Sequence, residues 1–281
     1  MAGTLYIVAT PIGNLEDITL RGLRVLREAN LIACEDTRQT RKLLDHFAIT
    51  TPTLSYHEHN EAQRSVELTQ RLEAGESIAL VSDAGTPLVS DPGHRLVAEA
   101  IAAGITVAPV PGPSAAIGAL SASGLASDQF RFCGFLPPKS GQRRKVFEER
   151  KNDECTVIFY EAPHRILDSL TDAAQVFGSR PMVVARELTK IHEEFLRGTA
   201  AGIREQFAAR PSVKGEITLL IAPASRDDAS RDASEESQTP LDEAVRALEQ
   251  QGLPRMEAIK QVARERGLGK REVYLLVGKS R

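Results

Sequence analysis

Several residue types that often build or cross-link a protein core are scarce in this chain of 281 residues. Tryptophan is absent, aromatic residues make up 5%, and there are three cysteines. We therefore expect an aliphatic core. Cys34, Cys133 and Cys155 lie far apart in apolar segments without C-x-x-C spacing, which argues against a disulfide framework and a structural zinc site. We interpret them as buried thiols in a reducing cytoplasm.

Long hydrophobic runs are missing as well. The longest ones, such as Ile217 to Ala222, are far too short to cross a bilayer. No basic segment followed by an apolar one marks the N-terminus, so we expect no export signal. With 42% hydrophobic and 26% charged residues, the composition is typical of a globular, cytoplasmic protein without a membrane partner. The net charge of −3 does not by itself indicate a nucleic-acid partner.

Short aliphatic segments alternate with amphipathic ones over the first 222 residues, which predicts an α/β protein. Continuous apolar character is typical of strands buried on both faces of a largely parallel sheet. Gly75 and Gly104 close two of the expected helices, 62–72 and 96–103. The expected strands are Leu5–Ala9, Leu31–Cys34, Ile78–Val81, Thr106–Val110, Phe130–Phe135, Thr156–Tyr160, Met182–Ala185 and Glu216–Ile221.

Two composition changes divide the chain. Pro137 to Gly141 is typical of a hinge between two α/β domains, 1–136 and 137–224. The segment 225–240 has almost no large apolar residue and is typical of a flexible linker. Three short helical patterns follow in 241–281, and they predict a small helical domain of the helix-turn-helix kind.

Small-residue loops follow three of the expected strands. Ser82 to Pro87, Thr10 to Asn14 and Pro111 to Ala115 come at carboxyl ends, where open α/β sheets bind ligands. Neither G-x-G-x-x-G nor a Walker loop is present, which disfavours a dinucleotide or a triphosphate. The carboxylate of Asp83 suits a ribose or a cationic ligand, and Asp91 is expected to cap the next helix. The simpler alternative is a set of ordinary strand-to-helix turns.

Ordered motifs along nearly the whole chain resemble one family. They are Val8 to Leu15, Glu35 to Arg38, Ser55 to Glu61, Ser82 to Pro87 with Ser90 to Gly93, Pro111 to Ala115, Gly134 to Pro137, Glu161 to Arg165 and Arg186 to Lys190. Together they resemble the RsmI family, the ribosomal small-subunit RNA 2′-O-methyltransferases of the tetrapyrrole methylase superfamily. The pattern departs only at Ala162, where Ser is expected.

The resemblance implies two α/β domains of tetrapyrrole methylase type with S-adenosylmethionine in the cleft between them, plus the helical C-terminal domain. It also implies methylation of a cytidine ribose in the decoding region of 16S rRNA (cytidine 1402). The partner would be small-subunit rRNA or the assembled subunit, and the protein would be a homodimer. The cofactor contacts that it implies are Pro11, Ile12, Asp83, Ala84, Gly85, Thr86, Ser114, Ala115, Tyr160 and Gly215.

Transfer of a methyl group to a hydroxyl benefits from a base or from a cation near the developing alkoxide. Glu35 and Arg38 follow the second expected strand, and we predict a catalytic role for them together with Lys190. Glu35 is the candidate base. The open alternative is that Asp36 or Thr37 of the same segment only caps a helix. His57 and His59 lack a third ligand, so no metal is expected, and contacts with RNA or the cleft wall are favoured.

Basic residues gather in two places. Lys139, Arg143 and Arg144 belong to a basic loop at the hinge, and Lys270 and Arg271 belong to the C-terminal domain. Such groups bind phosphates, and we predict that they and Arg165 contact RNA. The open alternative is a solvated surface.

Two other functions compete with RNA methylation. One is a methylase of a corrin precursor, against which the basic segments argue. The other is a ribosome-assembly factor without activity, against which the three small-residue loops argue.

Overall fold

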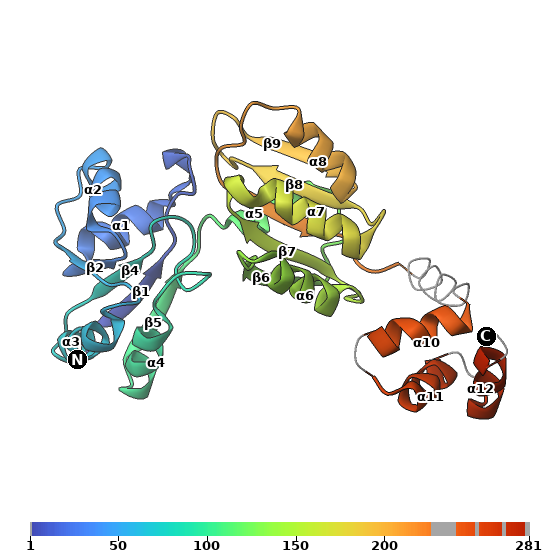
Figure 1. Cartoon of the computed structure of the whole chain (residues 1–281). Coiled ribbons are helices and arrows are strands. Elements are labelled where there is room, and N and C mark those ends of the chain that lie inside the picture. Colours follow the sequence, from blue (N-terminus) through green and yellow to red (C-terminus); the bar gives the residue numbers. More distant parts are fainter. Residues whose placement is uncertain (1, 226–239, 251–252, 266–267, 279–281) are drawn as a thin grey trace. The chain divides into compact units, whose positions relative to one another are not determined.

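The computed structural model describes residues 2–225, 240–250, 253–265 and 268–278. They fall into two units, Met1–Pro223 and Ala224–Arg281. The first unit holds two five-stranded sheets, and the second is helical (Figure 1). Within the described ranges, no helix combines the length and the apolar composition that a bilayer span requires.

The first sheet is entirely parallel. Its strands, in spatial order, are β3 (Thr53–Ser55), β2 (Leu31–Cys34), β4 (Ile78–Val81), β1 (Thr4–Val8) and β5 (Thr106–Val110). The helices of this half are α1 (Leu20–Glu28), α2 (Thr37–His46), α3 (Glu61–Glu73) and α4 (His94–Ala102), after a short 3-10 helix at Leu15–Asp17.

Both faces of this sheet are buried, and successive strand residues take part in different cores. Ile32 and Cys34 of β2 pack with Leu26 of α1 and Leu44 of α2. Leu31 and Ala33 belong to the cluster that holds α3 and α4 side chains. Side chains that alternate between two covered faces explain the continuous apolar runs, and the four expected strands of this half are confirmed.

The second sheet is mixed, which corrects the expectation of largely parallel pairing. Only the β6–β7 pair is parallel, and the other three pairs are antiparallel. A strand covered on both faces shows the same apolar run in either direction, so composition does not reveal the pairing. The strands, in spatial order, are β6 (Phe130–Phe135), β7 (Thr156–Glu161), β10 (Ile217–Ile221), β8 (Met182–Arg186) and β9 (Glu194–Gly198).

Four helices cover this second sheet. Ala116, Ala119 and Leu120 of α5 (Ala115–Ser123) pack on one face, with Ile158 of β7 and Leu220 of β10. The other face carries α6 (Ser140–Arg150), α7 (Ile166–Phe177), which follows a 3-10 helix at Pro163–Arg165, and α8 (Ala200–Ala208).

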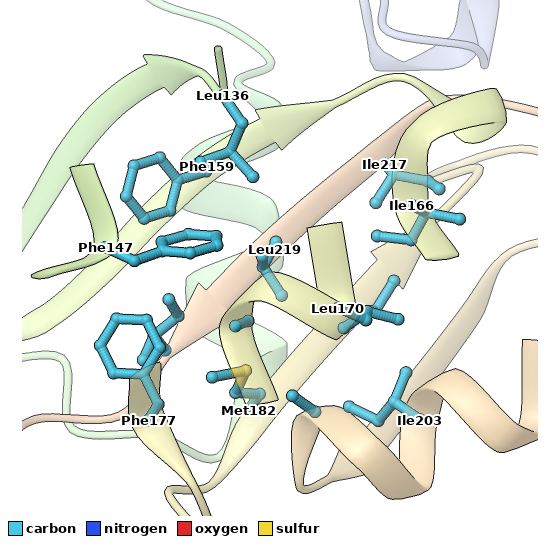
Figure 2. Close-up of a cluster of buried hydrophobic side chains, with 14 of the residues drawn as sticks. Leu136, Phe147, Phe159, Ile166, Leu170, Phe177, Met182, Ile203, Ile217 and Leu219 are labelled. Atoms are coloured by element: carbon cyan, nitrogen blue, oxygen red, sulfur yellow. The ribbon is translucent and has the colours of Figure 1, made fainter. Parts of the chain in front are cut away.

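The core under α6, α7 and α8 is partly aromatic, contrary to the expected aliphatic core. Figure 2 shows Phe147, Phe159 and Phe177 beside Leu219. The ring centres of Phe147 and Phe159 are 5.7 Å apart, and those of Phe147 and Phe177 are 5.4 Å apart, both in edge-to-face geometry. The few aromatic residues are therefore concentrated rather than spread.

The expected boundary at residue 136 is wrong. Both α5 and β6 belong to the second sheet and its cover, so the chain leaves the first half in the Pro111 to Ser114 segment after β5. Pro137 and Pro138 only precede α6, whose regular helix begins at Ser140 within the expected basic loop. The prolines belong to a turn inside the second half, and a turn of this kind has the same proline-rich composition as a hinge between domains.

The part of the second unit that the structure describes contains three helices, as expected. These are α10 (Leu241–Gln250), α11 (Arg255–Glu265) and α12 (Lys270–Gly278). Val245, Ile259 and Val273 form its core with four other buried residues, all from this unit. The expected linker, 225–240, lies outside the described residues except at its two ends.

Candidate cofactor pocket and active site

Hydrogen bonds join the three small-residue loops at the carboxyl edge of the first sheet. The backbone nitrogen of Thr10 donates to the Gly85 carbonyl at 2.9 Å, and the Gly85 nitrogen donates back at 3.0 Å. The Thr86 hydroxyl donates to the Pro113 carbonyl at 3.1 Å. The loops after β1, β4 and β5 therefore form one framework, as the positions of the strand ends predict.

The loop between β4 and α4 has an unusual backbone. Gly85, Leu88, Ser90 and Gly93 have φ values of 81°, 72°, 69° and 137°. A positive φ is rare for a bulky residue such as Leu88, and such strain gathers at functional sites. The Leu88 side chain packs against the core under α3 and α4, and a Cβ on Gly93 would lie 2.8 Å from Leu80. Core packing therefore holds this loop in place.

A cavity of about 390 Å³ opens on this framework, within the size range of small-molecule sites. The first half and the second half both contribute to its wall. Its lining residues are Ile12, Asp83, Ala84, Gly85, Thr86, Val89, Ser90, Asp91, Ser114, Ala115, Phe135, Tyr160, Glu161, Ala162, Pro163, Leu188, Glu216, Ile217 and Thr218. Four of these are carboxylates, and none is Lys, Arg or His, so the wall favours a cationic or neutral ligand over a phosphate.

Most of the residues expected at the cofactor lie in this wall. Ile12, Asp83, Ala84, Gly85, Thr86, Ser114, Ala115 and Tyr160 line the cavity, whereas Pro11 and Gly215 do not. Sequence reasoning did not place Phe135, Leu188 or Thr218 here. These three belong to the second half, and no local motif shows that they approach the β4–α4 loop.

Asp91 has a different position from the one expected. The cap residue of α4 is Gly93, and no side chain caps that helix. Asp91 instead lines the cavity. Burial raises its pKa to about 6, the negative charges of Glu35 and Asp83 add to the shift, and a hydrogen bond with Ser82 opposes it.

The segment after β2 divides its roles. The Asp36 carboxylate accepts from the backbone nitrogen of Arg38 at 2.8 Å and caps α2, as the capping alternative stated. It also pairs with the exposed Arg38 guanidinium at 2.7 Å, and these bonds lower the pKa of Asp36 to about 2. Glu35 is half-buried, and burial followed by the charge of Asp83 raises its pKa.

None of the three residues expected to be catalytic lines the cavity. Besides Glu35 and Arg38, this applies to Lys190, whose ammonium pairs with Glu187 at 2.8 Å and Glu216 at 2.9 Å. Burial opposes the charge of Lys190, but the two hydrogen bonds raise its pKa overall. Lys190 therefore holds Glu216, a lining residue, rather than facing the cavity itself.

Arg165 is also engaged within the second half. Its guanidinium pairs at 2.6 Å with Glu161, whose side chain is completely buried. Glu161 accepts further bonds from the Ser169 hydroxyl and, at 2.7 Å, from the backbone nitrogen of Ala162. This network fixes the wall of the cavity at the end of β7.

Of the residues expected to bind RNA, Arg143 is not available to RNA, so that prediction is wrong for this residue. Its guanidinium is buried and pairs with Asp172 at 2.6 Å, so it cannot reach a solvent-side phosphate. Lys139 and Arg144 are exposed, as are Lys270 and Arg271 in the second unit.

Within the described ranges, no group of three metal-binding side chains comes together. His57 lies 3.1 Å from the Asn60 amide nitrogen through Nε2.

Comparison with known proteins gives this geometry its context. The family model of the tetrapyrrole (corrin/porphyrin) methylases matches residues 4–204. The chain belongs to the tetrapyrrole methylase family. Within that family it is 49% identical over 272 residues to a ribosomal RNA small subunit methyltransferase I of Halalkalibacterium halodurans, covering 97% of this chain and 93% of the relative. A Synechocystis protein of the same name is 50% identical and covers 98% and 97%.

The fold of this chain also matches a solved structure. A crystal structure of diphthine synthase superposes with a TM-score of 0.63 over 82% of this chain and 94% of that one, at 14% identity. At that identity the likeness supports the fold alone. The expected α/β fold of tetrapyrrole methylase type is thereby confirmed.

Proposed function

We propose that this chain transfers a methyl group from S-adenosylmethionine to a ribose 2′-hydroxyl of a cytidine in small-subunit rRNA. The observation that carries the proposal is the cavity wall at three small-residue loops, to which the described residues contribute four carboxylates and no basic side chain. A sulfonium cation with a ribose fits this wall, and a nucleotide phosphate does not. The rRNA acceptor rests on the names of relatives that match the chain over nearly its full length.

The residues present fit the cofactor in kind. Asp83, at the end of β4, offers a carboxylate for ribose hydroxyls. Gly85 brings the backbone close, with Ile12 and Ala115 as apolar neighbours. Tyr160 closes the second-half side, and burial raises the pKa of its hydroxyl, so that it remains a neutral donor. When bound, S-adenosylmethionine supplies an electrophilic methyl group on a cationic sulfur.

The chain's main contribution to the rate is alignment of the ribose hydroxyl with that methyl group. Holding two reactants in reactive geometry contributes up to about 7–11 kcal/mol in ideal cases. The β4–α4 loop is suited to this task, because hydrogen bonds to the neighbouring loop and core packing fix its backbone.

RNA binding is assigned to exposed cations outside the cavity. Lys139 and Arg144 lie at the start of α6, and Lys270 and Arg271 lie at the start of α12. Their contacts with phosphates give affinity that falls with salt. We further propose a cytoplasmic homodimer whose substrate is rRNA or the assembled small subunit. Light scattering of the purified chain tests the dimer.

Label transfer tests the function. Protein with tritiated S-adenosylmethionine is offered small-subunit particles, naked rRNA and uroporphyrinogen, and we expect label in RNA only. Label in uroporphyrinogen alone would instead identify a tetrapyrrole methylase. Mapping the modified nucleotide in a deletion strain tests the cytidine 2′-hydroxyl.

Calorimetric titration with S-adenosylmethionine tests the cofactor. We expect binding that weakens in Asp83→Ala and stays unchanged in Glu73→Ala, a charge change at the far end of α3. Absence of binding by the wild-type chain would refute methyl transfer from this cofactor.

A further inference from the structure

The proposed reaction releases a proton from the acceptor hydroxyl, and the cavity wall offers few groups to take it. Its titratable lining residues are Asp83, Asp91, Tyr160, Glu161 and Glu216. Four of the five already have other partners or the wrong protonation state, as their contacts show.

Three carboxylates of the wall are engaged. Glu161 pairs with Arg165 and accepts hydrogen bonds from the Ser169 hydroxyl and the backbone nitrogen of Ala162. Glu216 pairs with Lys190 at 2.9 Å. Asp83 accepts from the backbone nitrogen of Asp36 at 3.0 Å, which ties the loop after β4 to the loop after β2. Each of these carboxylates already accepts from a cation or a backbone donor, which leaves its oxygens less available to the acceptor hydroxyl.

Asp91 differs from all of these. It forms no ion pair with any described residue, and the one group that lowers its pKa is the hydroxyl of Ser82, which also donates to the Ala84 carbonyl at 3.2 Å. It is half-buried in a loop whose backbone is held at Leu88 and Ser90 in the left-handed region. The loop therefore presents an uncompensated carboxylate to the cavity.

The charges around Asp91 come from several elements. Glu35 follows β2, Asp83 follows β4, and both are negative. Tyr160 of β7 faces Asp91 from the second half, and burial, together with the charges of Asp91 and Glu216, raises the pKa of that hydroxyl. With burial and two negative neighbours, the pKa of Asp91 rises to about 6. Such a carboxylate is ionised at neutral pH and is a stronger base than an ordinary aspartate.

Building on the proposed function, we propose that Asp91, rather than Glu35, is the catalytic base that accepts the proton of the acceptor hydroxyl. The O–H bond breaks and its proton passes to the Asp91 carboxylate. The oxygen's electron pair forms the new bond to the methyl carbon. The carbon–sulfur bond breaks, and its electron pair remains on sulfur, which becomes a neutral thioether.

Single-turnover methyl transfer to small-subunit particles, measured from pH 5 to pH 9 at saturating cofactor, tests this assignment. The wild-type rate is expected to fall on the acid side with a midpoint near 6, where Asp91 becomes protonated. Asp91→Asn is expected to lose that acid limb and about 10²–10⁴-fold in rate, the usual range for general base catalysis. Its affinity for S-adenosylmethionine should fall far less than its rate, because Asp83, Glu161 and Glu216 remain in the wall, and Asp91→Glu should regain an acid limb.

Two neighbours provide opposite controls. Glu35→Gln removes a negative charge that raises the pKa of Asp91, so its acid limb should move to lower pH while the limb persists. Ser82→Ala removes the hydrogen bond that lowers this pKa, so its limb should move to higher pH. A purely structural role of Asp91 would produce neither shift.

The outcomes separate this assignment from the proposed function. A wild-type protein that methylates RNA without an acid limb, or loses the limb in Glu35→Gln rather than in Asp91→Asn, overturns the role of Asp91 alone. So does an Asp91→Asn variant whose cofactor affinity falls as much as its rate. A wild-type protein that transfers no label to RNA overturns both.

Discussion

Asp36 and Asp91, which follow neighbouring strands of the first sheet, have pKa values shifted in opposite directions. Hydrogen bonds from Arg38 lower the pKa of Asp36 to about 2, whereas burial raises that of Asp91 to about 6. Asp36 is tied to the start of a helix, and Asp91 is held in a cavity wall without a cation. The same side chain thus serves as a cap in one loop and as a candidate base in the other.

The raised pKa of Asp91 predicts a pH-dependent stability effect. The folded state binds its proton more tightly than the unfolded chain does, so ionisation costs stability as pH rises from 3.8 towards about 6, and this cost stays constant above that. Asp91→Asn should therefore unfold at a higher temperature than the wild type at pH 8. The difference should shrink as pH falls through 6 to 4. Thermal melts at several pH values measure it, and a difference independent of pH would contradict the shift.

Gly85 is the second residue whose replacement is informative. Its φ of 81° disfavours any side chain, and a Cβ there would lie 3.3 Å from Ile12 in the cavity wall. Gly85→Ala should strain the loop by about 1–2 kcal/mol. We expect the free loop to relax and the bound loop to keep the strain, which corresponds to about a tenfold loss of affinity for S-adenosylmethionine. Titration calorimetry measures it. Gly118→Ala is the matched control, because a Cβ on Gly118 of α5 meets nothing within 4 Å.

At the scale of elements, α6 separates two adjacent arginines. Arg143 shares its helix face with the buried Phe147, four residues later, and pairs with Asp172 of α7. Arg144 is exposed and only reaches the rim of α7, at 3.4 Å from Gln175 and 3.9 Å from Asp172. Removing one partner of a buried ion pair costs about 3–5 kcal/mol. Arg143→Ala should therefore lower the free energy of unfolding by that amount, as denaturant melts measure.

Arg144→Ala provides the control for that prediction. An exposed substitution changes stability by less than about 0.5 kcal/mol, but it should weaken RNA binding and reduce its salt dependence. Equal stability of the two variants would contradict the division of α6 into a packed face and a solvent face.

Inner strands such as β2, β4 and β10 could be predicted from the sequence because burial on both faces leaves continuous apolar runs. The edge strands β3 and β9 could not, since Thr53–Ser55 is short and Glu194–Gly198 carries a half-buried Glu194 and an exposed Arg197. The buried position of Arg143 could be predicted, because a helix that begins at Ser140 places Arg143 on the same face as Phe147, four residues later. A loop has no helical period, so the expectation of a basic loop gave no reason to bury Arg143.

The candidate site was only half predictable for a related reason. Loops of the first half share one sheet edge, so their approach follows from strand order and from the glycines in them. The second-half wall, with Phe135 and Thr218, depends on the packing of two sheets against a common cavity. No spacing in the sequence encodes that packing. Only the family resemblance placed Tyr160 there.

At the scale of the whole molecule, the cavity of the first unit and the proposed RNA contacts of the C-terminal unit belong to separate parts of the chain. Among the described residues, none after Ile221 belongs to the clusters of the first unit, and the second unit has a core of its own around Val245 and Val273. Each unit therefore has the hydrophobic core that independent folding requires.

Truncation after Pro223 tests this separation. The truncated protein should keep its thermal transition and its affinity for S-adenosylmethionine, because none of the described residues beyond Thr218 belongs to the cavity wall. Methyl transfer to small-subunit particles should fall, with weaker RNA binding and a shallower dependence of affinity on salt. In a plot of the logarithm of the binding constant against the logarithm of salt concentration, the magnitude of the slope should decrease by about 0.7–0.9 for each phosphate that the truncated protein no longer neutralises.

The full-length double variant Lys270→Gln/Arg271→Gln is the matched control for truncation, since both side chains are exposed and outside the core of their unit. It should reproduce part of the change in salt slope while the C-terminal unit stays folded. If the truncated protein methylates particles at the full-length rate and with the same salt slope, the C-terminal unit does not bind the substrate, and the cations of α6 must carry the RNA contact alone.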